Sequence, residues 1–307
     1  SVVSLVISSK VAISSSWSFI VSFSTSLVVV LSFEVFPPKT NANYDSVRYA
    51  TESIAAIKPD YMSVTYGAGG GTSEYTVSIA SDILKSYGVT PLAHLTCVSS
   101  DKPKIIGLLS ELRRNGIENI LALRGDIPKD GSSSASEYRY AAQLIRDIKE
   151  HDSGFCIGGA CYPEGHVESP SISEDIRHLK EKVDVGCDFL TTQMFFDNNI
   201  LYSFLYKIRE AGITVPVVAG IMPVTNGKQI KRICELSGTY LPQRFKYIVD
   251  RFGDNPSAMK QAGIAYATEQ IIDLLANGVN AIHVYSMNKP EVAAQIRSNL
   301  SEIITGE

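Results

Sequence analysis

The sequence predicts a (β/α)₈ TIM barrel, and three observations support that prediction. Short apolar runs alternate with amphipathic helical segments over about 270 residues, and eight such runs match the count and size of that fold. Several helical segments end in a glycine that the next apolar run follows almost at once. No apolar run leads into the Gly-x-Gly-x-x-Gly turn that opens a helix in a doubly wound sheet, so that α/β alternative ranks second.

The strands are expected where apolar and β-branched residues cluster between turn-forming residues, and helices where apolar residues recur three and four positions apart. In chain order, the expected strands are Val28–Phe36, Tyr61–Tyr66, Thr90–Cys97, Asn119–Leu123, Phe155–Ala160, Phe189–Met194, Val215–Ala219 and Ala281–Tyr285. The clearest helices are Tyr75–Tyr87, Lys102–Asn115, Tyr138–His151, Ser173–Val185 and Asn199–Ala211.

Glycines mark the boundaries of these elements. Left-handed helix caps are expected at Gly88, Gly116, Gly186 and Gly212. The stretch Gly67–Gly71 has the wrong spacing for a dinucleotide fingerprint, so we interpret it as a flexible loop. The stretch from Leu241 to Asn277 is longer than one helix requires, which predicts extra helices before strand eight.

Composition limits the function classes. A formal charge of −4 and the lack of a basic run argue against nucleic acid as the main partner. The five cysteines show no Cys-x-x-Cys or zinc-type spacing, which is typical of buried thiols in a reduced, cytoplasmic protein. Residues 32–307 are expected to form a single (β/α)₈ catalytic domain.

Residues 1–31 do not match the rest of the chain. Ser and Val dominate this stretch, and Lys10 is its only charged side chain. We treat it as an atypical N-terminal extension of unknown role. The alternatives are a first helix with an unusual sequence and a targeting or membrane segment. A membrane span is not expected, because eight of residues 11–31 are Ser or Thr.

The segment SFEVFPPK, residues 32–39, places Glu34 inside an apolar strand that two prolines end abruptly. The apolar neighbours Phe33, Val35 and Phe36 are expected to raise the pKa of this carboxyl and suit it to donating a proton. A lone Glu in a strand is more often an edge or salt-bridged residue. The catalytic interpretation therefore depends on what else gathers near it.

Unusual polar residues follow the carboxyl ends of the expected strands. In a barrel these ends form one mouth, where active sites lie. The residues are Glu34, Thr65 and Tyr66, His94, Arg124 and Asp126, Tyr162, Glu164 and His166, Gln193, and Tyr285. Taken singly, His94 could be a core histidine and the Arg124–Asp126 stretch a surface ion pair. Together they predict an active site.

Particular chemistries can be weighed from these residues. Gly125 between Arg124 and Asp126 lets the backbone approach a ligand closely, so that Arg124 could hold a phosphate or ring carbonyl. Glu164 and His166 could share a metal, but no third ligand follows at a familiar spacing. No Ser-His-Asp or Cys-His arrangement stands out, and no strand-end lysine invites a Schiff base.

Eight ordered motifs resemble the methylenetetrahydrofolate reductase family from about Ser32 to about Leu300: SFEVFPPK, VTYGAGG, AHLTC, LALRGD, CYPEGH, TTQMFFD, GIMPVTNGKQ and HVYSMNK. The resemblance implies a barrel that binds FAD without a Rossmann motif. It also implies flavin-dependent reduction of 5,10-methylenetetrahydrofolate to 5-methyltetrahydrofolate by NADH or NADPH, with ping-pong kinetics. Because the chain stops at Glu307, we expect the short, bacterial-type form without the adenosylmethionine-sensing domain of eukaryotic members.

The family pattern also assigns roles to residues. It makes Glu34 the general acid that assists protonation of folate N5, and it places Asp126 near both the flavin and the folate. Gln193 and Gln229 correspond to folate contacts, and Lys289 stands where the family often has Arg. The positions implied to hold FAD or the nicotinamide donor are Thr65, Tyr66, Ala68, His94, Leu123, Arg124, Gly125, Asp126, Tyr140, Ala141, Tyr162, His166, Asp175 and Lys182.

Some positions depart from the family pattern. His178 and Glu181 stand where Asn and Arg are expected near the adenosine part of FAD. Ile233 replaces a Phe that can stack in relatives, which leaves the donor open between NADH, NADPH and a protein. The resemblance also implies a homo-oligomer.

Three other functions compete with this interpretation. The same flavoprotein could receive electrons from an iron–sulfur partner subunit. A flavin-free barrel could pass the methyl group of methyltetrahydrofolate to a corrinoid protein. A non-catalytic folate-binding module is the third alternative, against which Glu34 argues because a binding protein gains nothing from a carboxyl kept in an apolar strand.

Overall fold

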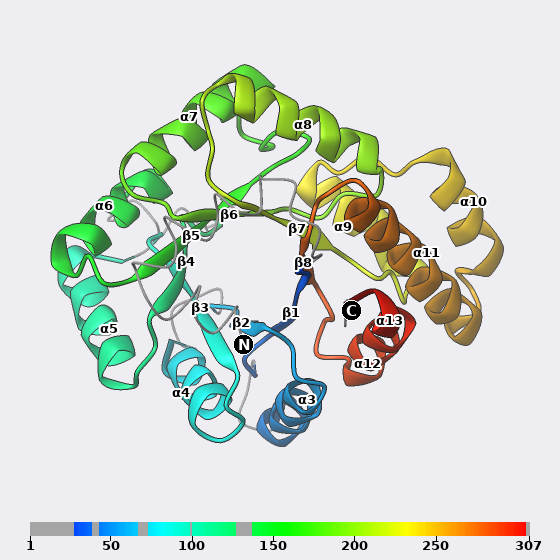
Figure 1. The fold of residues 1–307 in the computed structure, drawn as a ribbon, viewed down its shortest axis with the longest axis horizontal. Helices are drawn as coiled ribbons and strands as arrows, with labels where there is room; N and C mark the ends of the chain where they lie inside the picture. The colour runs from blue at the N-terminus through cyan, green and yellow to red at the C-terminus, as the bar shows by residue number, and fades with distance from the viewer. Residues whose placement is uncertain (1–27, 39–42, 67–72, 99, 127–136, 305–307) are drawn as a thin grey trace.

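Eight parallel strands close into a barrel in which each strand pairs with the next and β8 pairs with β1 (Figure 1). This computed structural model describes residues 28–38, 43–66, 73–98, 100–126 and 137–304. The predicted (β/α)₈ barrel is therefore confirmed. In Figure 1 the helices form an outer ring around the strands.

All eight expected strands are present, and most are shorter than the apolar runs that predicted them. Several of the polar residues noted above, among them Thr65, Gln193 and Tyr285, therefore lie just past a strand, in the loops at the mouth. The strands are β1 Val30–Val35, β2 Tyr61–Val64, β3 Thr90–Thr96, β4 Asn119–Leu123, β5 Cys156–Cys161, β6 Phe189–Thr192, β7 Val217–Ile221 and β8 Ala281–Val284.

The helices follow the strands in alternation, with additions before β8. They are α3 Tyr44–Ala56, α4 Ser73–Lys85, α5 Lys102–Arg114, α6 Ala141–His151, α7 Ile172–Asp184, α8 Asn198–Glu210, α9 Gly227–Ser237, α10 Gln243–Phe252, α11 Pro256–Ala276, α12 Pro290–Asn299 and α13 Ser301–Ile304. Three helices, α9 to α11, separate β7 from β8, so the predicted extra helices are confirmed.

Local sequence explains where the helices begin and end. Asp101 caps α5 by accepting a hydrogen bond from the backbone N–H of Lys104 at 2.9 Å, and Ser171 caps α7 in the same way. The predicted left-handed glycines are confirmed, with φ between 67° at Gly88 and 112° at Gly186. These signals are local, which is why the sequence alone revealed them.

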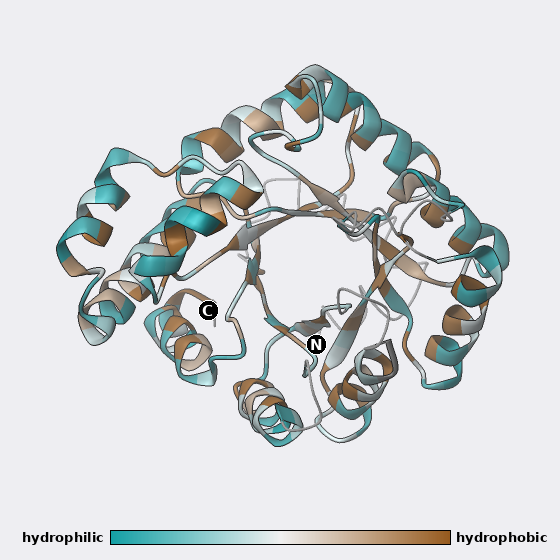
Figure 2. Ribbon diagram, turned by 180° about the vertical axis from the view of Figure 1, so that it is seen from behind, coloured by the Kyte–Doolittle hydropathy of each residue, from teal (hydrophilic) through white to brown (hydrophobic). Residues whose placement is uncertain are grey.

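The main core lies between the barrel wall and the helices. Side chains alternate along β1: Leu31, Phe33 and Val35 belong to this core, while Ser32 and Glu34 alternate with them and face the barrel interior. Hydrophobic residues accordingly lie on the helix faces turned toward the strands (Figure 2). The barrel interior holds polar side chains from several strands together with a small apolar cluster that includes Tyr61, Leu92 and Leu121.

Two expectations fall outside the described residues. Residues 1–27 of the N-terminal extension and the glycine-rich stretch Gly67–Gly71 are not described. Within residues 28–304, leaving out the gaps given above, no helix has the length and apolar character needed to cross a bilayer.

Candidate active site

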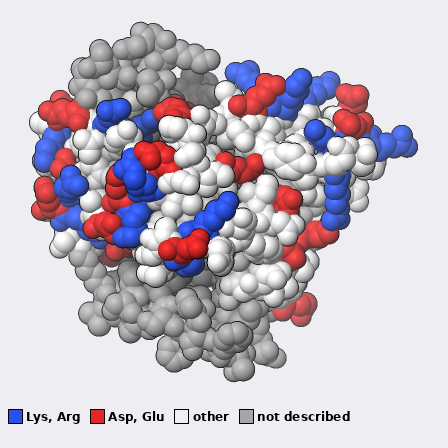
Figure 3. All heavy atoms as spheres, turned by 90° about the horizontal axis from the view of Figure 1, so that it is seen from above, with Lys and Arg blue, Asp and Glu red and all other residues white. Residues whose placement is uncertain are grey.

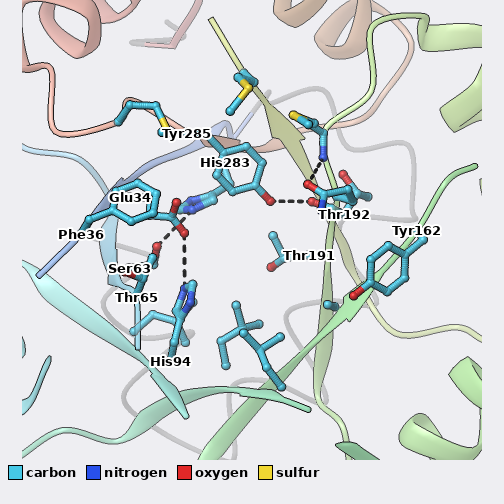
Figure 4. A pocket seen from close by; sticks show the side chains of 18 of the residues that line it. Glu34, Phe36, Ser63, Thr65, His94, Tyr162, Thr191, Thr192, His283 and Tyr285 are labelled. Carbon is cyan, nitrogen blue, oxygen red and sulfur yellow. Dashed lines mark hydrogen bonds and ion pairs between the residues drawn. The ribbon is translucent and has the colours of Figure 1, made fainter. Parts of the chain in front are cut away.

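A cavity of about 460 Å³ opens among the carboxyl ends of the strands (Figure 4). All eight strands or the loops that follow them contribute side chains to its wall. The lining residues on which the chemistry depends are Glu34, Phe36, Tyr61, Ser63, Thr65, His94, Leu123, Asp126, Tyr162, Thr191, Gln193, His283 and Tyr285.

Glu34 projects from β1 into this cavity and is 5% exposed. Burial raises the pKa of its carboxyl to about 8, so the group holds a proton at neutral pH. The direction of this pKa shift agrees with the sequence prediction, but its physical cause differs. Phe33 and Val35 pack into the core on the opposite side of the strand, and only Phe36 shares the cavity with Glu34. Enclosure by the barrel, rather than its sequence neighbours, removes water from the carboxyl.

His94 on β3 points toward Glu34 (Figure 4). Its Nε2 lies 3.7 Å from Oε2 of Glu34, which is too long for a hydrogen bond. Burial lowers the pKa of His94 to about 3, so the imidazole is neutral. Since Glu34 is protonated under the same conditions, the two groups form a neutral acid–imidazole pair and not a salt bridge.

His283 on β8 lies between two serines in the barrel interior. Its Nδ1 is 2.8 Å from the hydroxyl of Ser32, and its Nε2 is 3.1 Å from the hydroxyl of Ser63. Ser32 also donates to the carbonyl of Ile282 at 3.1 Å, and this network assigns the ring proton to Nδ1 and leaves Nε2 to accept from Ser63. Burial, with a smaller contribution from His94, lowers the pKa of His283 to about 3.

His283 and its two serines were not among the site residues expected from the sequence. The sequence does contain a signal for His283. It stands two residues before Tyr285, and alternate residues of a strand share a face. The register also pairs Glu34 with Ser63 on neighbouring strands. The interior below the acid is therefore a layer of neutral hydrogen-bonding groups.

Tyr285 closes the cavity on the side of β6 and β7. Its hydroxyl donates to the carbonyl of Thr192 at 2.6 Å. A Cβ on Gly220 would lie 2.4 Å from that carbonyl oxygen and 2.6 Å from the tyrosine hydroxyl, so only glycine fits there.

Three buried polar atoms on the cavity wall have no hydrogen-bond partner within the described chain: the hydroxyl of Tyr61, Nε2 of His94 and the hydroxyl of Thr191. Buried polar groups are normally hydrogen-bonded, and an unpaired one costs about 1–3 kcal/mol. The cavity is thus built to contain water or a polar ligand.

The structure brings seven of the eighteen site residues expected from the sequence into this cavity. These are Glu34, Thr65, His94, Leu123, Asp126, Tyr162 and Gln193. Asp126 is exposed at the mouth, whereas Gln193 is half-buried and accepts a hydrogen bond from the backbone N–H of Met194.

A second group of expected residues lies beside the cavity around Arg124. Arg124 forms a bidentate ion pair with Glu168, at 2.6 and 2.8 Å. His166 accepts a hydrogen bond from the backbone N–H of Glu168 at 3.1 Å and meets Tyr162 edge-on. Gly125 has φ +86°, and a Cβ there would lie 2.6 Å from Val98.

Lys182 and Asp175 belong to α7 on the same side. Lys182 donates to the carbonyl of Ala160 at 2.7 Å, and burial lowers the pKa of its ammonium group. Asp175 accepts from the hydroxyl of Ser169 at 3.2 Å.

The remaining expected residues lie farther out. Tyr140 precedes Ala141, the first residue of α6, and stacks on His178 with ring centroids 4.9 Å apart. Gln229 is exposed on α9, and Lys289 donates to the hydroxyl of Thr225. The expected residues Tyr66, half-buried against the core, and Ala68, outside the described residues, complete the set.

Glu164 does not meet His166 as a metal pair would. Its Oε2 accepts a hydrogen bond from the backbone N–H of Tyr240 at 2.7 Å, which ties the β5–α7 loop to the end of α9. Over the part of the chain that the structure describes, no three His, Cys, Asp or Glu side chains gather as a metal site.

Comparison with known proteins extends these observations. A family model described as methylenetetrahydrofolate reductase matches residues 22–301. Methylenetetrahydrofolate reductase 1 of Schizosaccharomyces pombe is 36% identical over 276 residues, which cover 89% of this chain and 46% of the relative. The 5,10-methylenetetrahydrofolate reductase of Escherichia coli is 34% identical over 266 residues, covering 87% of this chain and 88% of the relative.

The chain thus spans about half the length of the fungal and plant relatives it matches. Among solved structures, an uncharacterized protein from Clostridium thermocellum that binds two copies of 5-methyl-5,6,7,8-tetrahydrofolic acid superposes with a TM-score of 0.60. The match covers 94% of this chain and 99% of that one. Its 14% sequence identity supports the fold alone.

Proposed function

The chain belongs to the methylenetetrahydrofolate reductase family, and from that membership we propose that it reduces 5,10-methylenetetrahydrofolate to 5-methyltetrahydrofolate. The proposal includes NADH or NADPH as electron source and FAD as cofactor. One observation carries it: the Glu34 carboxyl is enclosed in the cavity at the mouth of the barrel, where burial raises its pKa to about 8. A carboxyl kept neutral in this way is suited to donate a proton near pH 7.

The cavity and its surroundings fit FAD. Nε2 of His94 and the hydroxyls of Tyr61 and Thr191 are unpaired in the described chain and available to a polar ring. Beside the cavity, Arg124 offers a guanidinium to an anionic group. The residues proposed to hold the cofactor are Thr65, Tyr66, Ala68, His94, Leu123, Arg124, Gly125, Asp126, Tyr140, Ala141, Tyr162, His166, Asp175 and Lys182. FAD, when bound, would carry the hydride from the nicotinamide to the folate.

Glu34 would activate the folate ring. Its proton assists protonation at N5 and must then pass from N5 to N10, because N5 needs a free lone pair to form the iminium. The five-membered ring opens at the bond between the methylene carbon and N10. N10 keeps the bonding electron pair and ends with the proton, while the methylene carbon accepts hydride and remains on N5 as the methyl group. Glu34 must regain one proton from solvent in each turnover.

Other residues would position the substrates. Asp126 and Gln193 line the cavity and are proposed folate contacts, and Asp126 would also lie close to the flavin. Gln229 and Lys289 would meet the part of the folate that leaves the cavity. Because both substrates use one cavity, ping-pong kinetics are expected.

An anaerobic visible spectrum of the purified, FAD-supplied protein tests the proposal. We expect a flavin band that NADH or NADPH bleaches and that 5,10-methylenetetrahydrofolate restores. A band that neither nucleotide bleaches would identify an enzyme fed by a partner protein. Folded protein with no flavin band would contradict the reductase and favour a flavin-free folate barrel.

A further inference from the structure

The end of β1 extends beyond the last residue of its neighbour β8. The register pairs Phe33 with Val284, where β8 ends, whereas β1 continues through Glu34 to Val35. On its other side, β1 stays paired with β2 as far as Val35. Glu34 therefore stands where β1 has a strand neighbour on one side only.

Side chains of the loop between β8 and α12 occupy the side that β8 leaves open. The hydroxyl of Ser286 donates to the carbonyl of Glu34 at 3.1 Å. The Asn288 amide accepts a hydrogen bond from the backbone N–H of Phe36 at 2.8 Å and donates to the carbonyl of Phe36 at 2.9 Å. A neighbouring strand would satisfy backbone groups of the same kind, so these three hydrogen bonds, here called the β1 clamp, replace strand pairing.

The loop reaches β1 through two residues in the left-handed backbone region. The φ angles are 57° at Met287 and 54° at Asn288. In the described part of the chain, Lys58 is the only other non-glycine residue with positive φ. This conformation is disfavoured for residues with a Cβ, persists where other contacts impose it and is concentrated at functional sites. The clamp thus keeps a backbone arrangement that local preference opposes, which points to a role in the site.

The clamp fixes part of the cavity wall. Glu34 and Phe36 both line the cavity, where Figure 4 labels them, and Met287 lines it as well. The loop continues directly into α12, whose buried Val292 packs in the main core. The position of the acid is thereby tied to a packed helix. This tie matters for a reaction, because a displacement of about 1 Å at a reacting group can slow catalysis about a hundredfold.

The clamp is made of neutral groups. Figure 3 shows charged side chains spread over the outer surface of the face it draws. The three clamp bonds instead join a hydroxyl and an amide to backbone groups. Lys289, the first charged residue after β8, directs its ammonium group to the hydroxyl of Thr225. Removing the clamp would therefore act on Glu34 through its position and its contact with water, and not through a change of charge.

We propose that Asn288, together with Ser286, is a positioning residue that holds the end of β1, so that the Glu34 carboxyl stays aimed into the cavity and Phe36 limits the access of water to it. This inference rests on the proposed function, in which Glu34 donates the proton. Asn288 acts through the backbone of Phe36, and Ser286 acts through the backbone of Glu34. Neither side chain has to contact the folate.

The first measurement compares the two half-reactions of the FAD-loaded enzyme by stopped-flow. Asn288→Gly removes the amide and leaves a residue that adopts the left-handed region readily. We expect flavin oxidation by 5,10-methylenetetrahydrofolate to slow about ten- to hundredfold, and flavin reduction by the nicotinamide nucleotide to change by less than about twofold. Ser286→Ala removes the other clamp bond and should slow the same half-reaction by a smaller factor. It also provides the test if Asn288→Gly does not fold.

Asn198→Ala is the matched control. The Asn198 amide also bridges distant parts of the chain, because it donates to the carbonyl of Gln270 at 3.0 Å. This bond joins α8 to α11, and Asn198 does not line the cavity. The control should lower thermal stability without separating the two half-reactions.

A second readout follows the Glu34 carboxyl without catalysis. Infrared difference spectroscopy against Glu34→Gln records the carbonyl stretch of the protonated acid as the pH is varied. In the wild type the pKa should lie at about 8, where burial places it. In Asn288→Gly it should fall by about one pH unit, because water then reaches the carboxyl.

Other titratable groups of the cavity do not confuse this titration. Burial lowers the pKa of both histidines to about 3 and raises the pKa of the three tyrosines, so these five groups keep their charge near pH 8. Asp126, exposed at the mouth, is common to the wild type and the variants. The titratable groups that line the cavity with Glu34 are His94, His283, Tyr61, Tyr162, Tyr285 and Asp126.

The two readouts separate the inference from the proposed function. A lower pKa of Glu34 in an Asn288→Gly protein whose wild type lacks reductase activity would support the clamp and overturn the reductase. An unchanged pKa together with equal slowing of both half-reactions would overturn the clamp. So would an Asn198→Ala control that slows only the folate half-reaction, and to the same degree.

Discussion

The two sides of the barrel mouth differ in whether their titratable side chains are neutral or charged. On the side of β1, β3 and β8, Glu34, His94 and His283 are buried, and burial shifts the pKa of each toward its neutral form. On the side of β4, β5 and α7, Arg124 is ion-paired with Glu168 in contact with solvent. Figure 4 labels Glu34, His94 and His283 of the first side among the residues that line the cavity.

This difference separates chemistry from binding. An exposed ion pair is worth about 0–1 kcal/mol and can be exchanged for a ligand at little cost. A carboxyl whose pKa has moved from 4.5 to about 8 strongly resists ionisation, at about 1.4 kcal/mol for each unit. The first side therefore keeps the Glu34 carboxyl protonated and able to donate. On the second side, an anionic ligand can replace Glu168 as the partner of Arg124.

The largest effect is expected from Glu34→Gln, which keeps the shape of the side chain and removes its acid. Folate reduction should fall by about 10²–10⁴, equivalent to about 3–5 kcal/mol at the barrier. Flavin reduction by the nicotinamide should survive, because no proton from Glu34 is needed there. Stopped-flow measurement of the two half-reactions checks this, with Glu168→Gln as the control. Equal loss in both half-reactions would remove Glu34 from the acid role.

The same variant should change how stability depends on pH. In the unfolded chain Glu34 ionises near 4.5, and in the folded protein near 8, so between these values the folded state holds a proton that the unfolded state has lost. Wild-type stability relative to Glu34→Gln should therefore fall with rising pH by about 1.4 kcal/mol per unit across that window. Urea unfolding at several pH values measures it.

The variant Asp152→Asn is a control for which the pH dependence of stability should have the opposite sign. Burial of Asp152 is outweighed by hydrogen bonds from the backbone N–H of Gly154 and from Arg113, which lower the pKa of its carboxyl. The stability this aspartate contributes should be present at neutral pH and disappear as pH falls through its folded pKa. If the pH dependence of stability changes in the same direction in both variants, burial does not set the pKa of Glu34.

Much of the fold was predictable because its signals are local. Apolar runs, glycine caps and the prolines after Phe36 act within a few residues, and each of the eight strands they marked is present. The common mouth followed from topology, since parallel strands of a closed barrel end on the same side. On that basis the sequence predicts that Glu34, His94 and Gln193 lie together, and all three line the cavity.

The remainder depends on contacts between distant residues. Arg124 pairs with a glutamate 44 positions away, and Ser63 bonds to a histidine 220 positions away, and no local pattern encodes either partner. The environment of Glu34 was assigned to residues adjacent in sequence, yet adjacent residues of a strand face opposite ways. What surrounds a buried group is decided by the strands across the barrel.

The smallest effects are expected on the exposed side, and they test whether its charges serve binding. Glu168→Gln removes the partner of Arg124 from a pair that is in contact with solvent, so the free energy of unfolding should change by less than about 1 kcal/mol. Arg124→Gln should weaken FAD about tenfold, since a hydrogen bond to a charged group is worth about 1.5 kcal/mol or more. Glu168→Gln should change FAD affinity by less than about threefold. Fluorescence titration of the apoprotein with FAD measures both variants. If both variants lose FAD affinity equally, the intact ion pair between Arg124 and Glu168 is what shapes the binding site. The exposed side of the mouth would then be as preorganised as the buried side.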